Sequence, residues 1–174
     1  EISARYNLYH GSLSLKETTA YPYSGQVKLV VCDNSAGKVN LYLRAPAWGD
    51  DYHLLLNGNT VPVTVKDGFI IMSRNFRKGD VLELTFTERA GMEQVQNKMN
   101  TDPSWRRVFY GPLLLGAEGR SDVTLPAGAV VSKESADRYS CGGGVILTPV
   151  YHLMDGKVLK EKDYQKQIIF QLSR

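Results

Sequence analysis

Short segments in which apolar and polar residues alternate dominate the first half of this sequence, and turn-forming residues separate them. The clearest is residues 39–44, where Val39, Leu41 and Leu43 would point to one side and Asn40, Tyr42 and Arg44 to the other. A period of two residues is typical of a β-strand with one buried and one wet face. Segments this short and this closely spaced predict antiparallel strands, since parallel strands need long crossover connections.

Turn signals mark where the chain reverses between these segments. The strongest is Asn57-Gly58, and Asp67-Gly68 and residues 78–80 follow. Asparagine or aspartate before glycine suits a two-residue hairpin, because both positions there need a positive φ. The predicted strands are residues 26–32, 39–44, 53–56, 61–65, 69–73 and 81–86. The predicted fold class is therefore all-β, an antiparallel β-sandwich of jelly-roll type.

A second, smaller β module is predicted after a polar, turn-rich linker at residues 97–104. We place the sandwich in residues 1–96 and the second module in residues 97–174. Residues 89–99, before the linker, suit a helix or an extended linker equally. The apolar segments of the second module are residues 108–119, split by Gly111-Pro112, and residues 121–131, 141–153 and 167–172. The lysine-rich residues 157–166 predict a solvated hairpin or loop.

The charge pattern excludes several classes of partner. The net charge is +3, from 21 Lys and Arg against 18 Asp and Glu, and the basic residues are scattered. A nucleic-acid surface would cluster them, so we expect no nucleic-acid partner. No apolar run is long enough to cross a bilayer, and we expect no membrane partner. Because the chain starts at Glu1 rather than Met, we expect a processed product or an excised fragment. As a separate expectation, we place the protein in the periplasm or outside the cell.

Residues that could carry chemistry are few. The sequence contains no catalytic motif of the serine-hydrolase, zinc-protease, phosphate-loop or dinucleotide-binding kind. Cys32 and Cys141 have no partner at metal-ligand spacing, so we predict no metal site and no cofactor. The two cysteines suit one disulfide or two free thiols equally. Glu118, beside an apolar run, is the carboxylate that stands out most, and an exposed acid at a strand end is the simpler interpretation.

Trp48 ends the alternating strand and suits two different roles, a surface that stacks on sugar or a plug that closes the core. Pro46 has no backbone N–H, so the chain must leave the sheet there. Alternation counted from Leu43 would place Ala45 and Ala47 on the buried side of a straight strand, but Pro46 makes a straight continuation improbable, so parity is a poor guide here. An indole buries on the order of 200 Å², and we therefore favour the core plug. The candidate carbohydrate-binding residues of the alternative are Trp48, Tyr52 and Trp105.

Six short motifs follow one another in a fixed order. They are Tyr-Pro-aromatic-x-Gly at residues 21–25, Arg-x-Pro-x-Trp at 44–48, Asn-Gly at 57–58, Gly-aromatic at 68–69, Lys-Gly-Asp at 78–80 and Gly-Pro-Leu at 111–113. In this order the set resembles the C-terminal β-sandwich region of glycoside hydrolase family 127. That family contains β-L-arabinofuranosidases and related bacterial enzymes. The resemblance covers residues 21–119.

The resemblance implies that the chemistry of such a protein lies outside this chain. The family's catalytic unit is an N-terminal (α/α)6 barrel with a zinc-bound cysteine nucleophile, and no position here matches its catalytic motifs. We therefore interpret the chain as a non-catalytic accessory region that packs on and supports such a barrel, its partner in the same protein.

Two other classes of function stay open. One is an autonomous carbohydrate-binding module for a plant-type oligosaccharide or polysaccharide, and an exposed row of aromatic side chains would favour it. The other is a structural or adhesive surface domain that uses the same sandwich without sugar. A broad apolar patch on one sheet would favour the docked accessory region.

Overall fold

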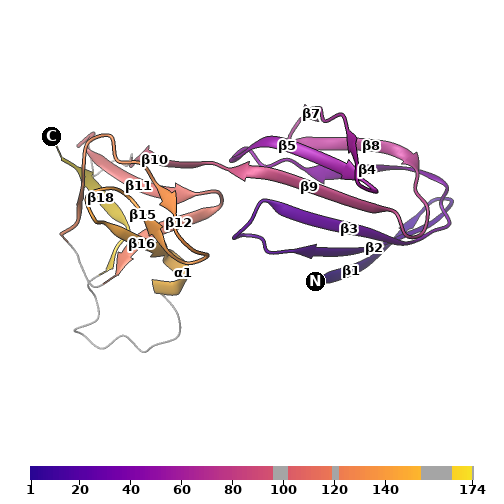
Figure 1. The fold of residues 1–174 in the computed structure, drawn as a ribbon, viewed down its shortest axis with the longest axis horizontal. Coiled ribbons are helices and arrows are strands. Elements are labelled where there is room, and N and C mark those ends of the chain that lie inside the picture. The colour runs from indigo at the N-terminus through magenta and orange to yellow at the C-terminus, as the bar shows by residue number, and fades with distance from the viewer. Residues whose placement is uncertain (96–101, 119–121, 154–165, 174) are drawn as a thin grey trace. The chain divides into compact units, whose positions relative to one another are not determined.

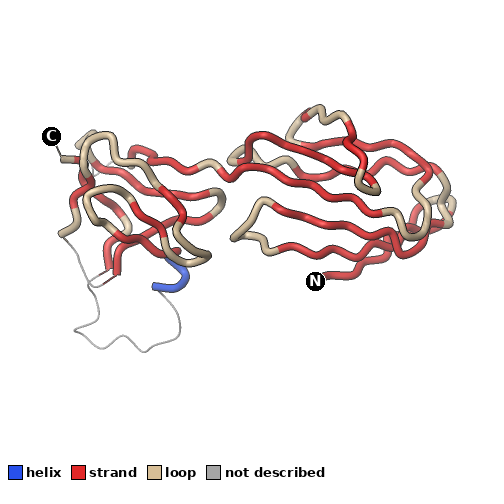
Figure 2. The backbone as a smooth tube through the Cα atoms, viewed as in Figure 1, coloured by secondary structure: helices blue, strands red, loops and turns tan. Residues whose placement is uncertain are grey.

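The computed structural model describes residues 1–95, 102–118, 122–153 and 166–173. The chain forms two compact units, Glu1–Glu88 and Arg89–Arg174. Nearly all regular structure in both is β (Figures 1 and 2). The all-β fold class is therefore confirmed. The units divide at Glu88, whereas the predicted boundary at residues 96 and 97 lies outside the described residues.

The first unit is a β-sandwich of two antiparallel sheets. The larger sheet has six strands in the order β1-β2-β3-β9-β5-β6, and the smaller has three in the order β4-β8-β7. The strands are β1 (Ile2–Leu8), β2 (Gly11–Thr19), β3 (Gln26–Asn34), β4 (Lys38–Arg44), β5 (Gly49–Leu56), β6 (Asn59–Val61), β7 (Val65–Lys66), β8 (Phe69–Asn75) and β9 (Val81–Glu88).

The core of this unit lies between the inner faces of the two sheets. On β4, Val39 and Leu43 are buried while Tyr42 is exposed, as the alternation predicts. On β9, Leu82 and Leu84 are buried on the same face. Side chains from both sheets thus form one aliphatic cluster.

Two of the predicted turns form hairpins. The chain reverses between β5 and β6 at Asn57-Gly58 and between β7 and β8 at Asp67-Gly68, and all four residues have positive φ. The predicted strand at residues 61–65 is wrong. Strand β6 ends at Val61 and β7 begins at Val65, because a proline at position 62 has no N–H to donate to a ladder.

The hairpin of β1 and β2 precedes the first strand that the sequence pattern predicts. Strand β1 is the edge of the six-stranded sheet, and six of its seven residues are exposed. Residues 2–8 nevertheless alternate, with Ile2, Ala4, Tyr6 and Leu8 on one side, so the sequence held the signal for β1 and our prediction missed it.

One end of the sandwich, which we call the closed end, is sealed by Phe76, 2% exposed. The Asn34 side-chain amide donates to the carbonyl oxygens of Gly37, at 2.8 Å, and Phe76, at 2.9 Å. These bonds join the β3–β4 loop to the segment after β8. The backbone polar groups at this end therefore find partners within the protein.

Asp80, buried at the same end, organises the turn between β8 and β9. Its carboxylate accepts hydrogen bonds from the Arg77 backbone N–H, at 2.8 Å, and from the Asn57 side chain, at 2.9 Å. The Asn57 side-chain oxygen in turn accepts the Val81 N–H. The two bonds to the carboxylate, that from Arg77 first, lower the pKa of Asp80 below its ordinary value.

The described residues of the second unit form mainly one sheet, in the order β13-β18-β11-β12-β16-β15-β14, with β10 beside β11 and β17 beside β12. Its pairings are antiparallel except for β13 with β18. The elements are β10 (Ala90–Gln94), β11 (Trp105–Tyr110), β12 (Leu113–Glu118), β13 (Thr124–Leu125), β14 (Ser132–Lys133), β15 (Tyr139–Ser140), β16 (Ile146–Pro149), α1 (Val150–Leu153), β17 (Lys166–Gln167) and β18 (Ile169–Leu172).

Several predictions for this unit can be compared with the structure. Residues 90–94, which suited a helix or an extended linker, form a strand paired with β11. Gly111-Pro112 is the turn between β11 and β12, so the apolar run is two strands. The apolar segment 141–153 contains the strand β16, which ends at Pro149, and then the short helix α1, which buries Leu153. Most of the lysine-rich segment, residues 157–165, lies outside the described residues.

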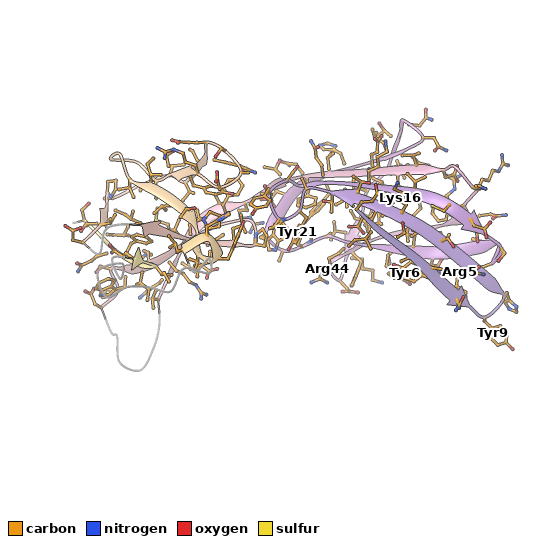
Figure 3. All side chains as sticks on the ribbon, turned by 90° about the horizontal axis from the view of Figure 1, so that it is seen from below. Arg5, Tyr6, Tyr9, Lys16, Tyr21 and Arg44 are labelled. Carbon is orange, nitrogen blue, oxygen red and sulfur yellow. The ribbon has the colours of Figure 1, made fainter. Side chains whose placement is uncertain are left out.

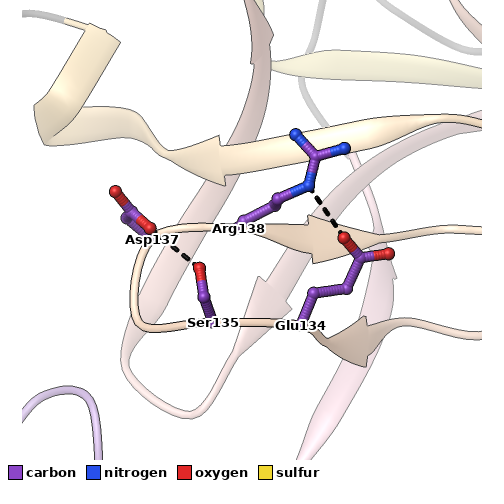
Figure 4. A network of polar contacts seen from close by, with 4 residues as sticks. All are labelled: Glu134, Ser135, Asp137 and Arg138. Carbon is purple, nitrogen blue, oxygen red and sulfur yellow. Dashed lines mark hydrogen bonds and ion pairs between the residues drawn. The ribbon is translucent and has the colours of Figure 1, made fainter.

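The hairpin of β14 and β15 is fastened by polar side chains (Figure 4). Arg138 donates to the Glu134 carboxylate at 2.8 Å, and the Ser135 hydroxyl lies 2.9 Å from a carboxylate oxygen of Asp137. These groups are largely exposed and contribute little to stability. Within the described ranges, no helix is long and apolar enough to cross a membrane.

Candidate functional site

The end of the first unit opposite Phe76 holds a groove of about 660 Å³, and we call this the open end. The loop between β2 and β3 and the turn between β4 and β5 form its rim. In antiparallel strands the chain returns to the same end after every second strand, so β3 and β4 bring these two connections together. Figure 3 shows Tyr21 and Arg44 at this end of the unit and Tyr9 at the other.

The floor of the groove is the inner face of the six-stranded sheet. Leu15 on β2 is buried in the core, and Glu17 and Thr19 continue the same face into the groove. Phe86 on β9 lines it as well. The smaller sheet leaves this part of the face uncovered, because β4 ends at Arg44 and the chain turns away after it.

Two aromatic side chains meet at the rim. The ring centroids of Tyr21 and Trp48 are 6.0 Å apart and their planes are inclined by 31°. Tyr21 is 52% exposed, and Trp48 is half-buried. Behind them, the Phe86 ring lies 5.6 Å from that of Trp48 and packs against the core. Trp48 is therefore part of the groove wall, and it lies outside the set of fully buried core residues.

The turn that carries Trp48 is held by one carbonyl group. The Pro46 oxygen accepts the Gly49 N–H, at 2.9 Å, and the Tyr52 hydroxyl. The Tyr52 ring packs against Phe86, with centroids 5.3 Å apart. Tyr52 thus supports the turn from behind.

The residues on either side of Pro46 differ in burial. Ala45 is buried, as predicted, and its N–H donates to the Gly68 carbonyl at 2.8 Å. Ala47 is exposed, whereas a straight continuation of the strand would have buried it. The turn at Pro46 interrupts the alternation, and parity counted from β4 no longer holds beyond it.

Gly25 lets the other rim loop approach the sheet closely. Its carbonyl accepts the Phe86 N–H at 2.9 Å. A Cβ atom at this position would lie 2.1 Å from the Phe86 carbonyl oxygen, a distance that no side chain tolerates. The glycine of the Tyr-Pro-aromatic-x-Gly motif is thus required by the contact between this loop and β9.

Two charged side chains of opposite sign also line the groove. The Arg44 guanidinium lies over the Phe69 ring, 5.1 Å from its centroid. Glu17 comes from β2, on the floor. Within the described part of the chain, neither side chain makes a hydrogen bond or an ion pair. Donors and acceptors are therefore available beside an aromatic wall.

The structure brings together some of the candidate residues and separates others. Trp48 and Tyr52 both contact Phe86, but Tyr52 supports the turn and does not line the groove. Trp105 lies in the second compact unit, at the start of β11. Tyr21 was not among the candidates, although the sequence held the signal: two predicted strands separate it from Trp48, which places both at one end of the sandwich.

The cysteines lie in different units and both are free thiols. Cys32 is exposed, and Cys141 is buried, which raises the pKa of its thiol. Across the described ranges, no group of three or more His, Cys, Asp or Glu could hold a metal ion. The backbone of Glu118 ends β12, opposite Lys166.

The first unit is thus a two-sheet sandwich with an aromatic-lined groove at its open end. The family model described as beta-L-arabinofuranosidase, GH127 middle domain, matches residues 2–88, which is 87 of the 174 residues and half of the chain. The chain belongs to the GH127 family. The match is to the family's middle domain and ends at the boundary of the first unit, whereas the resemblance read from the motifs began at residue 21.

Solved structures share the fold of both units. A protein described as a glycoside hydrolase has a TM-score of 0.74 and 20% identity, covering 99% of this chain and 34% of its own. The GH127 β-L-arabinofuranosidase from Geobacillus stearothermophilus T6 has a TM-score of 0.73 and 18% identity. The match covers 98% of this chain and 32% of that enzyme. The GH127 β-arabinofuranosidase BT3674 has a TM-score of 0.71 and 19% identity. The match covers 98% of this chain and 33% of BT3674.

The chain therefore spans about a third of the length of these similar proteins. Identities of this size establish the fold alone. A search of curated proteins finds no match.

Proposed function

We propose that this chain is the non-catalytic accessory β region of a glycoside hydrolase similar to the β-L-arabinofuranosidases, and that it packs on and supports the catalytic domain of its parent protein. The observation that carries the proposal is the match to the GH127 middle domain over the whole first unit. The similar solved structures are about three times as long, which leaves room in such proteins for a separate catalytic domain.

An apolar strip on β1 supports the docking role. Tyr6 lies opposite the buried Leu13, so both side chains point to the core side of the sheet. Yet Tyr6 is 51% exposed and Ile2 is 65% exposed, and Leu8 continues the strip. Exposed apolar side chains in a row are typical of surfaces that contact another domain. We assign this strip to the catalytic domain of the parent.

Activity of the chain alone tests the non-catalytic part of the proposal. We expect no release of the aryl group when the purified chain is incubated with aryl β-L-arabinofuranosides and with common aryl glycosides, because no residue matches the family's catalytic motifs. A family enzyme with its barrel serves as the positive control. Turnover that disappears on Glu118→Gln would show that this chain carries catalysis itself.

Substitutions in the β1 strip test the docking. In the parent protein, Tyr6→Lys is expected to lower the thermal midpoint, since it places a charge in an apolar contact. Tyr9→Lys is the matched control, because Tyr9 is 95% exposed at the adjacent turn. In the isolated chain both variants are expected to melt like the unaltered chain. If Tyr6→Lys lowers the thermal midpoint of the isolated chain as much as that of the parent protein, Tyr6 stabilises the sandwich itself and does not contact the catalytic domain.

A further inference from the structure

We propose that the groove at the open end binds a neutral oligosaccharide through four of its lining residues, the aromatic Tyr21 and Trp48 and the charged Arg44 and Glu17. Ile2, at the end of the β1 docking strip, also lines the groove, so the two surfaces adjoin. The chain would use the groove to hold substrate chains rather than to cleave them. The choice of arabinofuranosyl oligosaccharides as the first ligand rests on the proposed function.

The aromatic wall supplies the apolar part of such a site. Sugar rings present faces of C–H groups that pack on aromatic faces, while their hydroxyl groups point outward. Tyr21 and Trp48 both line the groove, and their ring planes are inclined by 31°. Phe86 and Tyr52 fix Trp48 from behind, so the wall is formed before a ligand arrives.

The polar groups favour a ligand with hydroxyls and no net charge. The Arg44 guanidinium is a donor only, and the Glu17 carboxylate is an acceptor only. A sugar hydroxyl group both donates and accepts, so an oligosaccharide offers a partner to either side chain. An anionic ligand would gain from Arg44 but meet repulsion from Glu17, and a cationic ligand the reverse. The opposite charges therefore select against ions of either sign.

The size of the groove is that of a small-molecule site. Its volume of about 660 Å³ falls within the roughly 300–1,000 Å³ of ligand pockets. Apolar and aromatic lining with a few polar groups is also the usual composition of such pockets. The groove thus has room for a short oligosaccharide.

Tryptophan fluorescence tests the proposal directly. The chain has two tryptophans, and Trp105→Phe leaves Trp48 as the single reporter. Titration of this variant with arabino-oligosaccharides is expected to give a saturable change in emission. Tyr21→Ala and Arg44→Gln are each expected to weaken the apparent affinity by about tenfold. Tyr9→Ala, an exposed tyrosine at the opposite end, is expected to leave it unchanged.

Three results would overturn the proposal. The first is no saturable response to neutral arabino-, xylo- or gluco-oligosaccharides up to about 10 mM, which would leave the groove as a contact surface for another domain. The second is binding that survives Tyr21→Ala in a chain with an unchanged melting curve. The third is tighter binding of an oligouronide than of the neutral sugar.

Failure here is distinguishable from failure of the accessory role. The hydrolysis and Tyr6 experiments use neither Tyr21 nor Arg44, so they report on the accessory role whatever the groove binds. Retention of the chain on an arabinan affinity gel, compared between the unaltered chain and Tyr21→Ala, gives an independent second measurement of groove binding.

Discussion

The two ends of the first unit solve the same structural problem differently. Each end of a β-sandwich leaves apolar side chains between the sheets that water must not reach. At the closed end, Phe76 is almost fully buried and the side chains of Asn34 and Asp80 bond to the backbone around it. At the open end, Trp48 is half-buried and faces a groove.

This difference separates stability from binding. A fully enclosed ring contributes all of its burial to the folded state, whereas a ring on a groove wall keeps part of its surface for another molecule. At the closed end the side chains of Asn34 and Asp80 bond to backbone groups. At the open end the groove residues Arg44 and Glu17 make no such bond within the described part of the chain. The same sandwich thus has one end suited to closing the core and one suited to contact with a ligand.

A pair of large-to-small substitutions gives the largest expected effect. Phe76→Ala is expected to cost about 3–5 kcal/mol of unfolding free energy, as removal of a buried aromatic ring does. Trp48→Ala is expected to cost less, about 1–3 kcal/mol, because part of the indole already contacts water. Urea denaturation of both variants measures the difference. If the two variants lose the same free energy of unfolding, the two ends do not differ in this way and Trp48 closes the core as Phe76 does.

Asp80→Asn gives a smaller effect that depends on pH. An amide can accept only one of the two hydrogen bonds that the carboxylate accepts, so we expect a loss of about 1–3 kcal/mol at neutral pH. The pKa of Asp80 is lowered on folding, so its contribution is fully present above its ordinary value of 3.8 and is lost as the pH falls through the lower folded value.

Urea midpoints of the unaltered chain and of Asp80→Asn, measured from pH 7 into the acid range, test this. The two curves are expected to converge below the ordinary pKa of aspartate. Curves that stay parallel throughout would show that the carboxylate charge contributes nothing to the closed end.

The sequence pattern predicted the parts of the fold that depend on neighbouring residues. Alternation in residues 39–43 placed Val39 and Leu43 in the core, and Asn57-Gly58 placed a hairpin. Both signals are local, since side-chain direction and turn geometry are set within a few residues. The same local signal was present in β1, where Ile2, Tyr6 and Leu8 share one side of the strand, and our prediction missed it.

The groove depended on contacts that no local pattern encodes. Tyr21 and Trp48 come from different connections, and Glu17 joins them from a strand that the pattern did not predict. Alternation also cannot predict side-chain direction beyond a turn, as Ala47 shows: it follows Pro46 and is exposed. Strand counting alone could have placed the two aromatic residues at one end, and their ring geometry needed the structure.

The Pro46 carbonyl accepts hydrogen bonds from both Gly49 and Tyr52, and these bonds reduce the conformational entropy that the turn can lose on binding. Because the Trp48 turn is already ordered in the free protein, few backbone torsions are left to freeze when a ligand enters. Association then needs no rearrangement of this rim, and the encounter itself sets its rate.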